Sequence, residues 1–278
     1  MIYKQIKTTL QKKIPFLFNI LYLIKYRKLT KTIFMNFSKL FYGLLNSFKI
    51  TKLYKTSTGL YYLPFLSYKD TVRRKIINNE IYEKEIVDIA AEYIEPNSIV
   101  LDIGANFGQM SILFSETQRN VKVFAFEAQK YVFELLEKNV KVNDKKNIKC
   151  FYNLVGSKSG IENIKINKLY KFGSWGANNI EYSSNKQRST KIKAIKIDDI
   201  KFDQTISFMK VDVQGLDLDV LRGAKNTIKY HRMPIIFEYE SIFENIYDYK
   251  FDDIEKILNE INYEVKTKIG NDFLIVPS

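Results

Sequence analysis

Two glycines and two carboxylates form the pattern in this chain with the clearest chemical meaning. The segment 98–108 reads SIVLDIGANFG, in which Asp102 precedes Gly104 by two residues and Gly108 follows at the end. The next apolar segment ends at Glu127. Glycines between a strand and a helix let backbone N–H groups approach a ligand, and the positive end of the helix favours negative charge there. The pattern therefore predicts a site for an anionic or nucleotide-like ligand.

The spacing of the glycines separates two classes of cofactor. A dinucleotide fingerprint requires G-x-G-x-x-G, but Asn106 and Gln109 occupy the second and third glycine positions counted from Gly104, so NAD is disfavoured. The order D-x-G-x-x-x-G resembles motif I of class I S-adenosylmethionine methyltransferases, where the turn holds the methionine part of the cofactor. Glu127 lies 23 residues after Gly104, near the offset of about 20 at which an acidic side chain reaches ribose hydroxyls.

The surrounding sequence alternates apolar, β-branched strands with segments of helical periodicity. Strands are expected at 99–103, 121–126, 148–155, 208–213 and 234–239, and helices at 80–94, 109–118, 131–142, 218–230 and 252–261. Shorter runs predict inserted antiparallel strands at 161–166, 179–182 and 192–197 and a terminal hairpin at 263–267 and 272–276. This order predicts a doubly wound, Rossmann-like α/β sheet closed by an antiparallel hairpin, with its ligand outside the carboxyl ends of the strands.

The basic residues are unevenly distributed along the chain. The 278 residues carry a net charge of +13, yet residues 1–69 contain 13 Lys and Arg without one acidic residue, which leaves the remainder formally neutral. The catalytic part therefore has no overall attraction for phosphate backbones, and nucleic acid is an unlikely partner. The single cysteine, Cys150, excludes a disulfide scaffold and a Cys-rich metal site, and we expect no bound metal.

Residues 1–55 combine basic clusters with two apolar segments. The 11-residue run 14–24 is too short to cross a bilayer of about 30 Å, and no small-residue cleavage site follows it. Apolar residues recur at steps of three and four from Phe34 to Phe48, which predicts a basic amphipathic helix on an anionic membrane surface. The same face could instead pack on the catalytic domain or on a second subunit of a homodimer. Residues 56–79 are expected to form a linker or small β element, and residues 80–278 the catalytic domain.

Four ordered blocks extend the resemblance beyond motif I. VLDIGANFGQMSILF, FAFEAQ, FMKVDVQGLDLDVLRGA and PIIFEYE together resemble the FkbM-type methyltransferases, over about residues 81–240. The resemblance implies S-adenosylmethionine-dependent O-methylation of sugars, glycolipids or polyketides. Tyr82-Glu83 is similar to the short Tyr-Glu element of the family. Where that family usually has Asp-Val-Glu-Gly and then a Glu, this chain has Gln214 and Asp217, and the change at Gln214 removes a charge.

The motif and the resemblance together give a set of cofactor-binding residues. We expect S-adenosylmethionine to contact Glu83, Asp102, Gly104, Ala105, Asn106, Gly108, Glu127, Ala128, Asn153 and Asp212. Asp102 could accept hydrogen bonds from turn amides or from the ammonium group of the cofactor, or could only orient the turn. Glu127 could bind the ribose hydroxyls or be an exposed helix cap.

Asp212, Lys210 and Glu238 are the catalytic candidates. Asp212 is expected at the end of the fourth strand, beside the methyl-transfer centre, as base or acceptor-orienting group. Lys210 lies on the same side of that strand, where it could tune the carboxylate or form a structural ion pair with it. Glu238 is either a second carboxylate toward the substrate or a loop cap. His231, the only histidine, is expected at a helix end opposite the site, and Trp175 could stack on a sugar or pack in the core.

The sequence thus predicts an O-methyltransferase for a hydroxyl of a sugar, glycan or glycolipid. A lipid-linked saccharide is the favoured acceptor, with the enzyme in the cytoplasm, peripheral on the inner face of the membrane. A ribose 2'-hydroxyl or other nucleic-acid methyltransferase is one alternative, although the chain lacks an Asn-Pro-Pro-aromatic tetrad for exocyclic amines. A non-catalytic, membrane-associated scaffold with the same fold is another, and the intact motif I opposes it.

Overall fold

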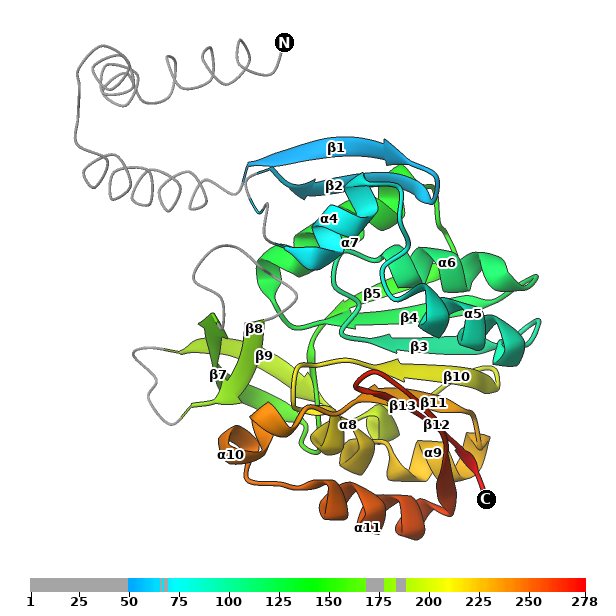
Figure 1. Ribbon diagram of the computed structural model, residues 1–278, viewed down its shortest axis with the longest axis vertical. Helices are drawn as coiled ribbons and strands as arrows, with labels where there is room; N and C mark the ends of the chain where they lie inside the picture. Colours follow the sequence, from blue (N-terminus) through cyan, green and yellow to red (C-terminus); the bar gives the residue numbers. More distant parts are fainter. Residues whose placement is uncertain (1–49, 66, 68–69, 169–177, 184–188) are drawn as a thin grey trace. The chain divides into compact units, whose positions relative to one another are not determined.

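A mixed seven-stranded sheet lies at the centre of a compact unit that spans Thr51–Ser278 (Figure 1). The computed structural model describes residues 50–65, 67, 70–168, 178–183 and 189–278. The strand order is β12 (Tyr263–Ile269), β13 (Asp272–Pro277), β11 (Ile235–Glu238), β10 (Ile206–Val211), β3 (Ile99–Ile103), β4 (Lys122–Glu127) and β5 (Ile148–Tyr152). The strands from β11 to β5 are parallel, β13 pairs antiparallel with β11, and β12 pairs antiparallel with β13. The predicted Rossmann-like α/β sheet with a terminal hairpin is confirmed.

Helices cover both faces of this sheet. In Figure 1, α5 (Lys84–Tyr93), α6 (Gln109–Thr117) and α7 (Lys130–Val142) lie on one side, and α8 (Asp217–Gly223), α9 (Lys225–His231) and α11 (Phe251–Ile261) on the other. Successive residues of β3 alternate between the two cores, so that Val100 packs with the first set and Leu101 with the second. The same alternation turns Asp102 toward α6. Burial on both faces explains the continuous apolar character of β3.

A hairpin precedes the Rossmann-like part and packs on α7. Its strands are β1 (Thr51–Thr56) and β2 (Gly59–Pro64), and α4 (Thr71–Ile77) follows. Asn139 on α7 and Asn143, the C-cap of that helix, accept hydrogen bonds from the backbone N–H groups of Tyr62 (2.6 Å) and Leu60 (2.8 Å). The compact unit therefore includes the hairpin and begins five residues before the linker expected from residue 56.

The inserted strands form a second sheet in the order β6-β9-β7-β8. These strands are β6 (Leu154–Val155), β9 (Thr190–Ile195), β7 (Gly160–Lys168) and β8 (Asn178–Tyr182). The expected single strand 148–155 is therefore divided at Asn153. The chain leaves β5 there to pair with β9, and the Asn153 amide donates to the Lys193 carbonyl (3.0 Å).

The helix expected at 218–230 is also divided. The break is at Ala224, whose backbone has φ −118° and ψ 4°. Asp198 accepts hydrogen bonds from the backbone N–H groups of Asn226 (3.2 Å) and Thr227 (2.8 Å), so a side chain from a distant segment caps the start of α9. Apolar periodicity continues across this break, which is why the sequence does not reveal it.

Some of the predicted features lie outside the described residues. These are most of the basic extension, including the amphipathic segment 34–48, and the part of the insertion that contains Trp175. None of the helices in the described part of the chain is both long and apolar enough to cross a membrane.

Candidate active site

The turn after β3 is shaped by a close approach to the end of β10. Gly104 has φ +84°, and its N–H and that of Ala105 both donate to the Phe126 carbonyl (2.9 Å each). A Cβ at position 104 would lie 1.8 Å from the Asp212 carbonyl oxygen, which no side chain allows. Gly108 (φ +85°) begins α6, and a Cβ there would lie 2.6 Å from Cδ1 of Leu136. Both glycines of the motif are thus required by the backbone path and by their neighbours.

Asp102 is fully buried at the end of β3, on the α6 side. Ser111 donates its hydroxyl to Oδ2, and Nζ of Lys210 lies 3.8 Å from Oδ1. Among the described residues Oδ1 has no hydrogen-bond donor, and burial raises the pKa of this carboxyl. Asp102 therefore contacts a serine rather than the expected turn amides.

Glu127 ends β4 and accepts two backbone hydrogen bonds, from Asn106 N–H (3.1 Å) and Gln129 N–H (2.7 Å). The side chain is buried rather than an exposed cap, and this burial raises its pKa to about 7. Asn106 has φ +51°, and its buried Oδ1 finds no donor within the described part of the chain. The hydrogen bond from Asn106 N–H thereby links the motif I turn directly to the carboxylate at the end of the next strand.

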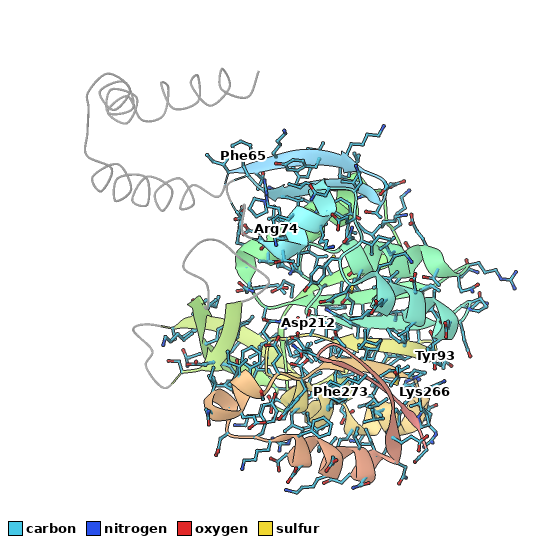
Figure 2. The ribbon with its side chains drawn as sticks, viewed as in Figure 1. Phe65, Arg74, Tyr93, Asp212, Lys266 and Phe273 are labelled. Atoms are coloured by element: carbon cyan, nitrogen blue, oxygen red, sulfur yellow. The ribbon has the colours of Figure 1, made fainter. Side chains whose placement is uncertain are left out.

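Lys210 and Asp212 lie together at the end of β10, as strand alternation predicts. The ammonium of Lys210 donates to the Gly104 carbonyl (3.1 Å) and to Oδ2 of Asp212 (3.3 Å). Desolvation of Lys210 lowers its pKa, but the carboxylates of Asp212 and Asp102 outweigh this effect and raise it. Figure 2 shows Asp212 between the central sheet and the inserted strands β7 to β9.

Glu238, at the end of β11, is connected to Asp212 by the side chain of Gln214. Nε2 of Gln214 donates to Oδ1 of Asp212 (3.0 Å) and to Oε2 of Glu238 (2.9 Å). Burial, followed by the charges of Asp212 and Asp217, raises the pKa of Glu238 to about 11. Glu238 therefore belongs to the same cluster as the other two catalytic candidates.

The segment before α5 completes this side of the site. Glu83 is the N-cap of α5 with φ +47°, and burial, reinforced by the charge of Asp212, raises its pKa to about 7. The neighbouring Tyr82 N–H donates to Oε1 of Gln109 (2.9 Å), whose Nε2 donates back to the Glu80 carbonyl (3.1 Å). The sequence analysis did not identify Gln109 as important; a polar residue buried immediately after Gly108 was the available signal.

Two other groups bear on the expected site. Asp272, which the sequence analysis also missed, has its pKa raised to about 6 by burial and by the charge of Asp212. His231 lies at the opposite end of β10, where its Nδ1 accepts a hydrogen bond from Ile206 N–H (3.2 Å). The histidine therefore has a structural contact away from the site.

Two adjoining hollows meet at the carboxyl ends of β3 and β10, and both are lined by Gly104, Asn106 and Asp212. The first is also lined by Glu127, Ala128, Asn153 and residues of the inserted sheet. The second includes Tyr82, Asp102, Gln109 and Lys210. The two oxygens without donors, on Asp102 and Asn106, belong to residues that line these hollows. An acceptor-rich lining of this kind fits a ligand that carries an ammonium group and ribose hydroxyls.

The comparison with known proteins agrees with this geometry. Residues 102–265 match the sequence model of the methyltransferase FkbM domain. The chain belongs to the FkbM methyltransferase family. Methyltransferase sdnD of Sordaria araneosa is 28% identical to this FkbM protein over an alignment of 182 residues, and the match covers 55% of this chain and 69% of sdnD.

Solved structures with related folds include methyltransferase FkbM from Methylobacillus flagellatus KT. It is 17% identical, with a TM-score of 0.44, and the match covers 68% of this chain but only 49% of that one. M. jannaschii TYW2 in complex with AdoMet is 12% identical, with a TM-score of 0.39, over 82% of this chain and 84% of that one.

This FkbM protein is an S-adenosylmethionine-dependent methyltransferase. The residues that line the two hollows would hold that cofactor. Glu127 and Asn106 offer acceptors in the first hollow and Asp102 in the second, while Gly104 lets the backbone come close to the ligand.

Proposed function

We propose that this enzyme methylates a hydroxyl group of a sugar, glycan or glycolipid. The observation that carries the proposal is the position of Asp212, which lines both hollows and keeps 21% of its side chain exposed while Lys210 holds one of its oxygens. A carboxylate in this position can accept a hydrogen bond from an alcohol and take its proton. The bound cofactor supplies an electrophilic methyl group, so positioning and proton removal remain for the protein.

The charge around Asp212 favours a neutral acceptor over a nucleic acid. The carboxyl groups that interact electrostatically at this edge of the sheet are Glu83, Asp102, Asp212, Asp217, Glu238 and Asp272. Lys210 interacts electrostatically with four of them, Glu83, Asp102, Asp212 and Asp272. A phosphate backbone close to this cluster would be repelled, whereas hydroxyl groups can donate to its oxygens. The ribose 2'-hydroxyl alternative is therefore the less favoured one.

Product analysis with isotope-labelled S-adenosylmethionine tests the acceptor class. The purified full chain is incubated with a glycolipid fraction, with the same glycans after lipid removal, or with total RNA. We expect label as a methyl ether on a sugar of the glycolipid, and none in any fraction with Asp212→Asn. Label found only in RNA would overturn the proposal, and label in the delipidated glycans at equal rate would remove the lipid requirement.

We further propose that the basic extension, residues 1–55, holds the enzyme on the cytoplasmic surface of a membrane, where a lipid-linked acceptor is presented. The support is the sequence alone: 13 basic and no acidic residues precede Asp70, together with the apolar periodicity from Phe34 to Phe48. Each basic residue near an anionic surface contributes about 1 kcal/mol, so binding should be strong at low salt and weaken as salt is added.

Vesicle co-sedimentation tests this membrane proposal with the full chain. Replacing Lys25, Arg27 and Lys28 together with Gln should weaken binding to anionic vesicles, while neutral vesicles should bind little of either protein. The matched control replaces three lysines of the catalytic unit, Lys84, Lys146 and Lys266, with Gln. If the wild type ignores anionic vesicles, or if the triple variant loses an oligomeric state instead, the extension belongs to a protein interface.

A further inference from the structure

Gln214 occupies a fixed position between two carboxyl groups. Its backbone has φ +54°, in the left-handed region that a glutamine rarely adopts. The Tyr247 hydroxyl lies 3.2 Å from the Gln214 carbonyl and 2.9 Å from the Ile180 carbonyl of β8, which ties this turn to the inserted sheet. A Cβ at the adjacent Gly215 would lie 2.3 Å from the Tyr247 ring, so the turn packs closely against α10 (Glu244–Tyr247). The surroundings thus hold an unfavourable backbone conformation in place.

The side-chain amide of Gln214 donates hydrogen bonds to two carboxyl groups, Asp212 and Glu238, which differ in their other contacts. Its NH₂ group has two hydrogens, and the distances of 3.0 Å to Asp212 and 2.9 Å to Glu238 assign one to each carboxyl group. Asp212 also receives the Lys210 ammonium at 3.3 Å. Glu238 has no ion pair with a Lys or Arg among the described residues.

Four carboxyl groups interact electrostatically with Glu238. They belong to Asp212 after β10, Asp217 of α8, Glu240 after β11 and Asp272 of β13, and burial adds to their effect. Two carboxylates so close together cannot both be ionised without a large penalty unless a cation is shared between them. Glu238, which has no such cation among the described residues, keeps the proton.

We infer that Gln214 is a positioning residue that holds Asp212, paired with the Lys210 ammonium, and a protonated Glu238 side by side at the acceptor site. Asp212 lines both hollows and Gln214 lines the first, and the Gln214 amide holds Glu238 beside them. Such a pair suits an acceptor with two neighbouring oxygens: one hydroxyl donates its proton to Asp212, and the next oxygen accepts a hydrogen bond from Glu238. The choice of a sugar-like diol rests on the proposed function, whereas the protonation pattern does not.

Infrared difference spectroscopy tests the protonation pattern without any acceptor. At pH 8 the wild-type enzyme should show the C=O stretching band of a protonated carboxyl group that disappears in Glu238→Gln. Gln214→Glu removes the amide donor and adds a third carboxyl group, so a protonated-carboxyl band should gain intensity. The same substitution at an exposed glutamine, Gln118→Glu, is the control and should leave the band unchanged. A spectrum identical in the wild type and both site variants would overturn the inference.

The second measurement is the pH–rate profile with a glycan that the enzyme has been shown to methylate. In Gln214→Glu the acidic limb of kcat should move up by at least one pH unit and kcat should fall about 100-fold near neutral pH, while the Kd for S-adenosylhomocysteine changes less than threefold. A merely structural glutamine would change stability or Kd but not the position of this limb. If the infrared results hold and no glycan is methylated, only the proposed acceptor class fails. If the glycan is methylated and the acidic limb stays unmoved, only the role of Gln214 fails.

Discussion

The Lys210 ammonium donates to the Gly104 carbonyl over 3.1 Å, and so joins the end of β10 to the motif I turn. Both ends of this contact are fixed, because Lys210 is 4% exposed and a Cβ on Gly104 has no space. The same ammonium lies between the carboxylates of Asp102 and Asp212. One ammonium group therefore contacts both the turn and the candidate base Asp212. The expected ion pair is present, and tuning of Asp212 by Lys210 stays a prediction.

Lys210→Met should destabilise the protein strongly. The methionine fills a similar volume but leaves the fully buried Asp102 without its cation, and removal of one partner of a buried ion pair typically costs about 3–5 kcal/mol. Urea unfolding followed by circular dichroism measures the free energy of unfolding. Lys146→Met, a change at an exposed lysine, is the control and should have little effect. Equal stability of wild type and Lys210→Met would mean that Asp102 is neutral and needs no cation.

Gly104→Ala and Gly270→Ala distinguish two reasons why a position requires glycine: backbone strain at positive φ, and the lack of space for a Cβ atom. Both positions have positive φ (+84° and +60°), but a Cβ at Gly270 meets no atom within 4 Å, whereas at Gly104 it would lie 1.8 Å from the Asp212 carbonyl. The strain of φ alone costs about 1–2 kcal/mol, so Gly270→Ala should lose that amount of unfolding free energy. Gly104→Ala should lose clearly more and should also abolish cofactor binding. Similar losses in both variants would show that the backbone near Asp212 moves freely.

Local patterns were sufficient to predict the sheet and the cofactor turn. β-branched runs located β3, β4 and β10, and the glycine spacing located the turn, because those features depend on residues close in sequence. The relative positions of Lys210 and Asp212 followed from strand alternation. These predictions required no knowledge of how distant segments pack.

Features that depend on long-range contacts could not be predicted in this way. Gln214 joins Asp212 to Glu238, 24 residues further along the chain, and Gln109 contacts Tyr82, 27 residues before it. The caps and breaks follow the same rule, since Asp198 starts α9 from a separate segment. Each of these contacts involves a polar residue whose hydrogen-bond partner cannot be identified from the sequence around it.

Glu127→Ala should weaken the binding of S-adenosylmethionine by about 1–3 kcal/mol, the usual cost of lost hydrogen bonds to a charged group. The carboxylate lines the first hollow and also organises Asn106 and Gln129 by accepting from their N–H groups. Calorimetry at pH 8 measures the affinity, and Glu134→Ala on the outside of α7 is the matched control. Wild-type affinity in Glu127→Ala would remove this residue from the cofactor site.

The stability of the protein should fall as pH rises from 5 to 8. Glu127, Glu83 and Asp217 have pKa values raised by burial to about 7, so the folded state keeps protons that the unfolded state loses near pH 4. The stabilisation that they contribute is complete below pH 4 and is lost as pH rises through 7. We expect a decrease on the order of 1–3 kcal/mol per buried carboxyl group in urea unfolding.

Glu127→Gln isolates one part of this pH dependence, because it removes a titrating group and retains an acceptor. The difference between wild type and Glu127→Gln should vary between pH 5 and 8, whereas Glu134→Gln should parallel the wild type. His231 acts in the opposite direction, since desolvation lowers its pKa, but it is common to all three proteins and cancels in the difference. A constant difference across this range would mean that Glu127 is ionised throughout.

Asp212→Asn should lower turnover much more than cofactor affinity. The amide keeps the size of the side chain but cannot take a proton from an acceptor hydroxyl, and loss of a general base commonly reduces rates 10²- to 10⁴-fold. Lys210 keeps its contacts with Gly104 and Asp102 in this variant, so the fold should persist. Steady-state rates with a glycan that the enzyme methylates measure turnover, and calorimetry of S-adenosylhomocysteine measures affinity for the cofactor product. Normal turnover in Asp212→Asn would make this residue structural, and Glu238→Gln would then be the variant expected to lose activity.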